Sequence, residues 1–149
     1  MTDTPEQQRK RASQYGNGDA SFHAAGGEEG IRHLIDDFYD IMDLLPEARS
    51  IRDMHPQDLT VSRDKLSRFL CGWLGGPKLY QEKYGRIQIP RAHSHLHIGI
   101  HERDTWLLCM WKALEAQPYS EDFKDYLIEQ LFVPAERSRN QDKQESHVP

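Results

Sequence analysis

Four of the eight histidines in this 149-residue chain fall within residues 85–110, and a tryptophan follows them in the same stretch. The histidines are His93, His95, His97 and His101, and the tryptophan is Trp106. Neutral imidazole is a common metal ligand, and its charge changes near neutral pH. The stretch could therefore form a metal site, a pH-sensitive patch, or a single iron ligand accompanied by bystander histidines.

Zinc is one metal that this stretch could bind. In an extended segment, alternating histidines send two imidazoles to one side, and zinc accepts them together with a carboxylate such as Glu102 or Asp104. This interpretation predicts a zinc-dependent hydrolase using His93, His95 and His97. The signal is weak, because catalytic zinc requires a rigid support and the sequence offers no second convincing strand to pair with this one.

The simplest alternative gives these histidines no chemistry. His95, His97 and His101 would face solvent from a loop or a helix, and His93 would bond a backbone group. Histidine is often found partly exposed, so this outcome is common for any single one. A helical interaction module without a cofactor would be the corresponding function.

Haem iron is the third option for the histidine-rich stretch. One neutral imidazole can bind haem iron from one side and leave the opposite side open to a small ligand. Hydrogen-bond donors near the open side would stabilise a polarised ligand such as O2. Tyr39, His55 and Trp106 supply a phenol, an imidazole and an indole, three different kinds of donor.

Helical periodicity dominates the elements that must hold these residues. Apolar residues recur at three- and four-residue spacing in four stretches, which end or begin at glycine, proline or serine. These predicted helices run from after Gly27 to Leu45 and over residues 59–74, 102–117 and 120–134. Weaker patterns predict short turns over residues 21–25 and 46–52 and near Tyr80. The sequence therefore predicts an all-α domain in which one long irregular segment carries the histidines.

Composition excludes several classes of function. The chain has 19 Lys and Arg against 24 Asp and Glu, a formal charge of -5, which argues against binding nucleic acid. Its N-terminus lacks the apolar core of a signal peptide, and no apolar run is long enough to span a bilayer. We therefore expect a cytoplasmic protein with no membrane partner. Cys71 and Cys109 lie far apart on apolar helix faces, which favours buried, reduced thiols.

The two ends of the chain differ from its middle. Their polar composition predicts a flexible or loosely docked extension over residues 1–20 and a disordered tail over residues 135–149. Residues 21–134 are long enough to form one domain with its own core.

A series of short motifs between Phe22 and Val133 resembles the truncated haemoglobins, most closely those of group II. The motifs are Gly26-Gly27, Phe38-Tyr39, Met54-His55-Pro56, Phe69-Leu70, Trp73-Leu74-Gly75-Gly76-Pro77, Leu79-Tyr80, Tyr84-Gly85, His93 with Ile98, and Glu102-Arg103-Asp104-Thr105-Trp106-Leu107-Leu108-Cys109-Met110. Each motif alone is weakly specific, whereas their order and spacing together are specific. The resemblance implies a truncated globin fold, a two-over-two helical sandwich with Gly-Gly turns and a long irregular segment before the proximal histidine.

The resemblance also implies a cofactor, haem b, and a role for each site residue. His93 would be the proximal iron ligand, since it lies thirteen residues before Trp106. Tyr39, His55 and Trp106 would stabilise a ligand on the distal side, and the other three histidines of the stretch would be surface residues. The remaining residues of the implied haem pocket are Phe38, Ser62, Leu66, Phe69, Tyr80, Arg91, Ile98 and Met110.

One departure from the family pattern concerns the haem propionates. Relatives commonly have an arginine immediately before the proximal histidine, where this chain has Ala92. Arg91, Arg86 and Lys65 are substitutes by charge.

The implied function is binding of O2, NO, CO or similar small ligands. The family further suggests oxygen transport, or detoxification by nitric oxide dioxygenase or peroxidase-type activity under nitrosative stress. Such turnover needs electrons, and the sequence has no flavin or nicotinamide motif. A separate reductase is therefore the expected partner.

Overall fold

The protein is represented by a computed structural model that describes residues 4–7, 14–86, 96 and 98–140. Over these residues it contains helices and turns and no strand, so the prediction of an all-α domain is confirmed. None of the described helices is both long and apolar enough to cross a membrane. The elements of the folded part are α2 (Ala20–Ala24), α3 (Gly27–Leu44), η1 (Pro46–Ala48), α4 (Arg49–Asp53), α5 (Thr60–Trp73), α6 (Leu79–Tyr84), α8 (Ile100–Glu115) and α9 (Glu121–Arg137).

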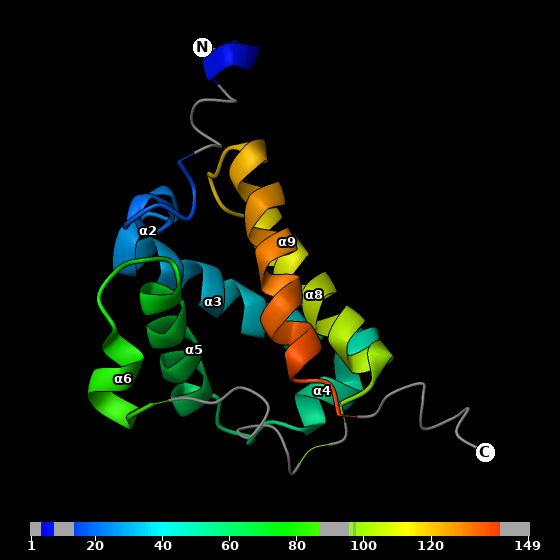
Figure 1. The fold of residues 1–149 in the computed structure, drawn as a ribbon. Helices are drawn as coiled ribbons and strands as arrows, with labels where there is room; N and C mark the ends of the chain where they lie inside the picture. Colours follow the sequence, from blue (N-terminus) through cyan, green and yellow to red (C-terminus); the bar gives the residue numbers. More distant parts are fainter. Residues whose placement is uncertain (1–3, 8–13, 87–95, 97, 141–149) are drawn as a thin grey trace, which may run out of the picture.

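Two helix pairs make up the domain. Helix α3 packs with α5, and α8 packs with α9; α3 also contacts α8, and the short helix α6 packs on α5. Figure 1 shows α8 and α9 side by side, with α3 running from beside α5 toward them. The core lies where α3 meets the others, and it includes Leu34, Phe38, Leu70, Met110 and Leu127.

Helix α3 forms the centre of this arrangement because one of its faces is apolar. Ile31, Leu34, Ile35, Phe38 and Met42 recur at helical spacing and are all buried. The helix begins after a glycine in the left-handed region, with φ of 88°, and two glutamates in its first turn complement the positive end of its dipole.

The abrupt end of α5 gives the N-terminal segment room to pack. Gly75 has a φ of 94°, and a β-carbon there would lie 1.9 Å from the carbonyl oxygen of Gly18. Gly76 donates its backbone N–H to Cys71 at 2.8 Å, and Phe22 donates to Leu74 at 3.0 Å. Side chains larger than hydrogen at this turn would displace the segment that precedes α2.

Helix α9 runs further than the sequence pattern predicts. Ser120 caps its start as expected, accepting a hydrogen bond from the Phe123 backbone at 3.4 Å. Its predicted end at Pro134 was wrong, because the helix continues to Arg137. A proline lacks an N–H donor, but its carbonyl can still accept, and that of Pro134 accepts the Ser138 N–H at 3.0 Å.

The two cysteines behave as predicted. Cys71 and Cys109 are free and fully buried in the core. Burial raises the pKa of each thiol to about 11, so both stay protonated at neutral pH.

Candidate functional site

A cavity of about 300 Å³ opens between the two helix pairs. Side chains from α3, α5 and α6 border it, and so do α8, α9 and the segment that leads into α8. The lining residues are Tyr39, Ile51, Met54, His55, Ser62, Lys65, Leu66, Phe69, Leu70, Tyr80, Leu96, Ile98, Glu102, Arg103, Trp106, Leu131, Pro134, Ala135 and Ser138.

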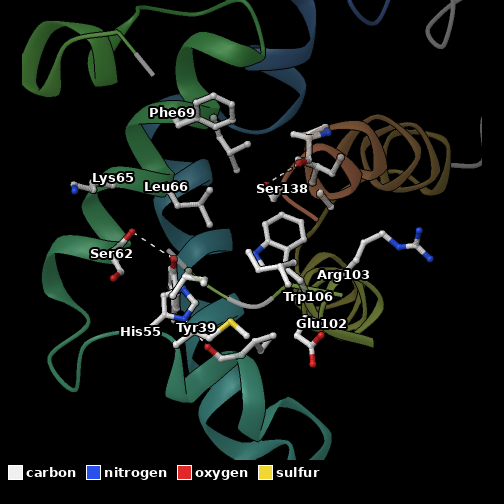
Figure 2. A pocket seen from close by; sticks show the side chains of 18 of the residues that line it. Tyr39, His55, Ser62, Lys65, Leu66, Phe69, Glu102, Arg103, Trp106 and Ser138 are labelled. Carbon is white, nitrogen blue, oxygen red and sulfur yellow. Dashed lines mark hydrogen bonds between the residues drawn. The ribbon is translucent and has the colours of Figure 1, made fainter. Parts of the chain in front are cut away.

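The long walls of the cavity are mainly apolar. Ser62, Leu66 and Phe69 lie three or four residues apart on α5, so they share the face that borders the cavity. Trp106 borders it from α8, and Leu131 does so from α9. Figure 2 shows Tyr39 and His55 at one end of the cavity, with Trp106 on the wall beside that end and Leu66 on the opposite side.

Tyr39 supplies a phenol at that end. It projects from α3 and is only 4% exposed, and its ring packs edge-on against Phe38 with 4.9 Å between centroids. Its hydroxyl donates to the backbone carbonyl of Ser62 at 3.5 Å, a long and therefore weak hydrogen bond. Burial raises the pKa of Tyr39 well above its ordinary value, against a smaller opposing effect of Arg63. The phenol therefore remains a donor at neutral pH.

His55 lies beside Tyr39, between α4 and α5. The two rings meet edge-on at 5.5 Å, and Nδ1 of His55 is 2.8 Å from the carbonyl oxygen of Ile51. A carbonyl can only accept, so Nδ1 carries the proton in the neutral ring and Nε2 is then an acceptor. Nε2 becomes a donor when the ring is protonated.

Trp106 supplies the third polar group. It lies on α8, partly buried, with its ring edge-on to Phe38 at 5.1 Å between centroids. Phe38 thus contacts both Tyr39 and Trp106 and holds the two side chains through one buried ring. An indole N–H can only donate, whatever the pH.

Two cationic side chains border the cavity. Lys65 lies on α5, and its Nζ is 5.3 Å from the ring centroid of Tyr84. Arg103 on α8 donates to Glu136 at 2.8 Å and also pairs with Asp104. Either cation could meet an anionic group of a ligand at the edge of the apolar space.

The structure brings most of the predicted site residues together. Phe38 and Met110 are fully buried in the core, and neither borders the cavity. His93 and Arg91 lie outside the described residues, as do His95 and His97. His101 is exposed on α8. The predicted residues that do border the cavity are Tyr39, His55, Ser62, Leu66, Phe69, Tyr80, Ile98 and Trp106.

Part of the cavity wall was not predicted from the sequence. Pro134, Ala135 and Ser138 border the cavity from the end of α9, and Leu96 does so from the segment before α8. Leu131 could have been found from its position on the apolar face of α9. The residues after Pro134 carry no such signal, because the pattern there is polar.

The donor set and the apolar lining of the cavity fit haem. Apolar walls suit a porphyrin ring, the phenol and indole at one end can donate to a small ligand, and the cations at the edge can pair with propionates. Among the described residues, no three His, Cys, Asp or Glu side chains are grouped as they would be around a metal ion. The zinc ligands predicted from the sequence, His93, His95 and His97, lie outside the described residues.

Comparisons with known proteins agree with this fit. Residues 20–140 match the family model described as Bacterial-like globin. The group 2 truncated hemoglobin YjbI of Bacillus subtilis (strain 168) is 33% identical over 128 residues, which cover 84% of this chain and 95% of that protein.

Solved structures share the fold. A cold-adapted truncated hemoglobin from the Antarctic bacterium Pseudoalteromonas haloplanktis TAC125 aligns with a TM-score of 0.78 and 33% identity, over 81% of this chain and 98% of that one. A group II 2-on-2 hemoglobin from Agrobacterium tumefaciens aligns with a TM-score of 0.76 and 37% identity, over 80% and 93%. The predicted two-over-two fold is confirmed. The chain belongs to the bacterial-like globin family, within the group II truncated haemoglobins.

Proposed function

We propose that this chain binds haem b, with His93 as the proximal iron ligand, and uses the cavity to hold O2 and other diatomic ligands. The observation that carries the proposal is the meeting of Tyr39, His55 and Trp106 from three separate parts of the chain at one end of an apolar cavity. Globins are haem proteins as a family, and a similar truncated haemoglobin from Bacillus subtilis, 30% identical, is described as oxygen-avid.

When bound, haem would supply an iron able to coordinate a diatomic ligand and, in nitric oxide dioxygenation, the one electron with which O2 and nitric oxide combine to nitrate. The chain supplies the surroundings. Tyr39 and Trp106 donate hydrogen bonds to a polarised ligand, and Leu66 and Phe69 exclude water from one wall. We assign Lys65, which borders the cavity, to a propionate, with Arg91 and Arg86 as further candidates.

Nitric oxide dioxygenation or peroxidase-type detoxification is the finer part of the proposal. One electron per turnover would return the iron to the ferrous state, and a separate reductase would deliver it. A cytoplasmic location stays a prediction of the sequence. The zinc hydrolase and the interaction module are not favoured, because the chain belongs to the globins.

The test is the visible spectrum and metal content of the purified full chain. We expect a haem absorption band, one iron per chain, and a spectral change when CO is added to the reduced protein. Stopped-flow mixing of the oxygenated protein with nitric oxide, with and without a reductase, then tests dioxygenation. A colourless preparation that contains zinc and takes up no haem would contradict the proposal.

A further inference from the structure

Asn140 joins the end of α9 to the segment that precedes α8. Its side-chain amide donates from Nδ2 to the carbonyl oxygen of Leu96, and its Oδ1 accepts from the backbone N–H of Ile98 at 2.8 Å. Its own backbone N–H donates to the carbonyl oxygen of Ile98 at 2.8 Å. One residue thus makes three hydrogen bonds to two neighbouring positions of the same segment.

These contacts require the particular chemistry of asparagine. A side-chain amide is both a donor and an acceptor, so it can bond a carbonyl and an N–H two residues apart. Aspartate would keep the acceptor for Ile98 but would place a carboxylate oxygen against the Leu96 carbonyl. Alanine would lose both side-chain bonds and keep the backbone bond to Ile98.

The end of α9 is held in place by its own contacts. Glu136 accepts from Arg139 at 2.8 Å and from Arg103 of α8 at 2.8 Å. The backbone also turns tightly here: the N–H of Ser138 donates to the carbonyl of Pro134, and the N–H of Arg139 donates to the carbonyl of Glu136 at 3.1 Å. These bonds close the end of the helix. This turn brings Asn140 back toward the start of α8, where Figure 1 shows the end of α9.

Leu96 and Ile98 both border the cavity, and Ile98 is only 8% exposed. Pro134 and Ser138, which lie at the end of α9 shortly before Asn140, border the same cavity. We propose that Asn140 is a positioning residue for the pocket: its three hydrogen bonds fix Leu96 and Ile98 as cavity wall and thereby slow the loss of haem. The haem part of this inference rests on the proposed function.

The first test is local and requires no haem. Amide hydrogen exchange is measured at Ile98 in the full chain and in Asn140→Ala, Asn140→Asp and Arg137→Ala. Arg137 is exposed near the same helix end and serves as the matched control. Losing a neutral hydrogen bond corresponds to roughly a tenfold change, so Ile98 should exchange about tenfold faster in Asn140→Ala. Asn140→Asp should lie between, and amides of α3 should not change.

The second test measures haem loss to excess apomyoglobin in the same variants. We expect release roughly three- to tenfold faster in Asn140→Ala, a smaller effect in Asn140→Asp, and none in Arg137→Ala. Unchanged haem loss together with faster Ile98 exchange would overturn the positioning role. Faster exchange throughout α3 would show a general loss of stability instead, and would also overturn it. If the unsubstituted chain binds no haem, the proposed function fails, while Ile98 exchange still reports on the contacts of Asn140.

Discussion

The two ends of the cavity are built in different ways. At the Tyr39 end, Phe38 packs edge-on against Tyr39 and Trp106, and Phe38 and Tyr39 are almost completely buried. At the Ile98 end, the wall is fastened by the amide of Asn140, and the element that carries it is fastened by the carboxylate of Glu136. One end is held by core packing, and the other by polar contacts near the surface.

This difference has consequences for rigidity. Aromatic edge contacts contribute about 0.5–1.5 kcal/mol each beyond the area they bury, and they do not depend on salt or pH. Exposed ion pairs contribute about 0–1 kcal/mol and are screened by salt. The donors of the Tyr39 end should therefore keep their positions under conditions that loosen the Ile98 end.

The largest expected effect is the loss of haem when the proximal ligand is replaced. His93→Ala should abolish normal haem retention, because we assign the proximal ligand to the segment that leads into the Ile98 wall. His95→Ala is the control and should retain haem. Haem content after gel filtration measures both. Retention in His93→Ala with loss in His95→Ala would mean that the proximal ligand is His95, two residues further along the chain.

Removing a donor from the Tyr39 end should give the next largest effect. Tyr39→Phe or Trp106→Phe should speed O2 dissociation by about tenfold or more, since a hydrogen bond to a polarised ligand contributes roughly 1.5–3 kcal/mol. The bond from Tyr39 to Ser62 is long at 3.5 Å, so little is lost when the phenol turns toward a ligand.

Flash photolysis or stopped-flow mixing measures this off-rate. Tyr119→Phe is the matched control, because its hydroxyl donates to Ala25 outside the cavity. Unchanged off-rates in both Tyr39→Phe and Trp106→Phe would remove the donor assignment at this end.

The smallest expected effect is the loss of stability at acid pH when Glu136 is protonated. Hydrogen bonds from Arg139 and then Arg103 lower the pKa of Glu136 from 4.5 to about 2. The carboxylate therefore contributes stability that is fully present above about pH 4.5 and is lost as the pH falls toward 2. Its side chain is 35% exposed, which limits the contribution to about 1 kcal/mol or less.

Urea unfolding of the full chain and of Glu136→Gln measures this contribution. The variant should be less stable at neutral pH by this small amount, and the difference should shrink as the pH is lowered below about 4.5. A stability difference that is the same at all pH values would show that the charge of Glu136 does not hold the end of α9.

Most of the fold and half of the site could be predicted from the sequence because their signals are local. The apolar spacing of α3 specifies a buried stripe, and the glycines at 26–27 and 75–76 specify sharp turns. Tyr39 and Trp106 could be named because the family motifs place them. The role of the residues after Pro134 could not be predicted, since a polar helix end has the same composition whether it is exposed or bound.

By itself, the sequence determined the helices, the reduced and buried cysteines, and the identity of the donors at the Tyr39 end. The helices and the buried cysteines follow from residue type and from spacing along one helix, whereas the donors follow from the motifs that the chain shares with its family. Only the tertiary structure decided that Phe38 lies behind the cavity and does not border it. It also decided that the side chain of Asn140, near the end of the chain, bonds Leu96 and Ile98 in the cavity wall. These contacts of Asn140 join residues more than 40 positions apart. Spacing along the chain carries no information about polar pairs that form only when two distant segments meet.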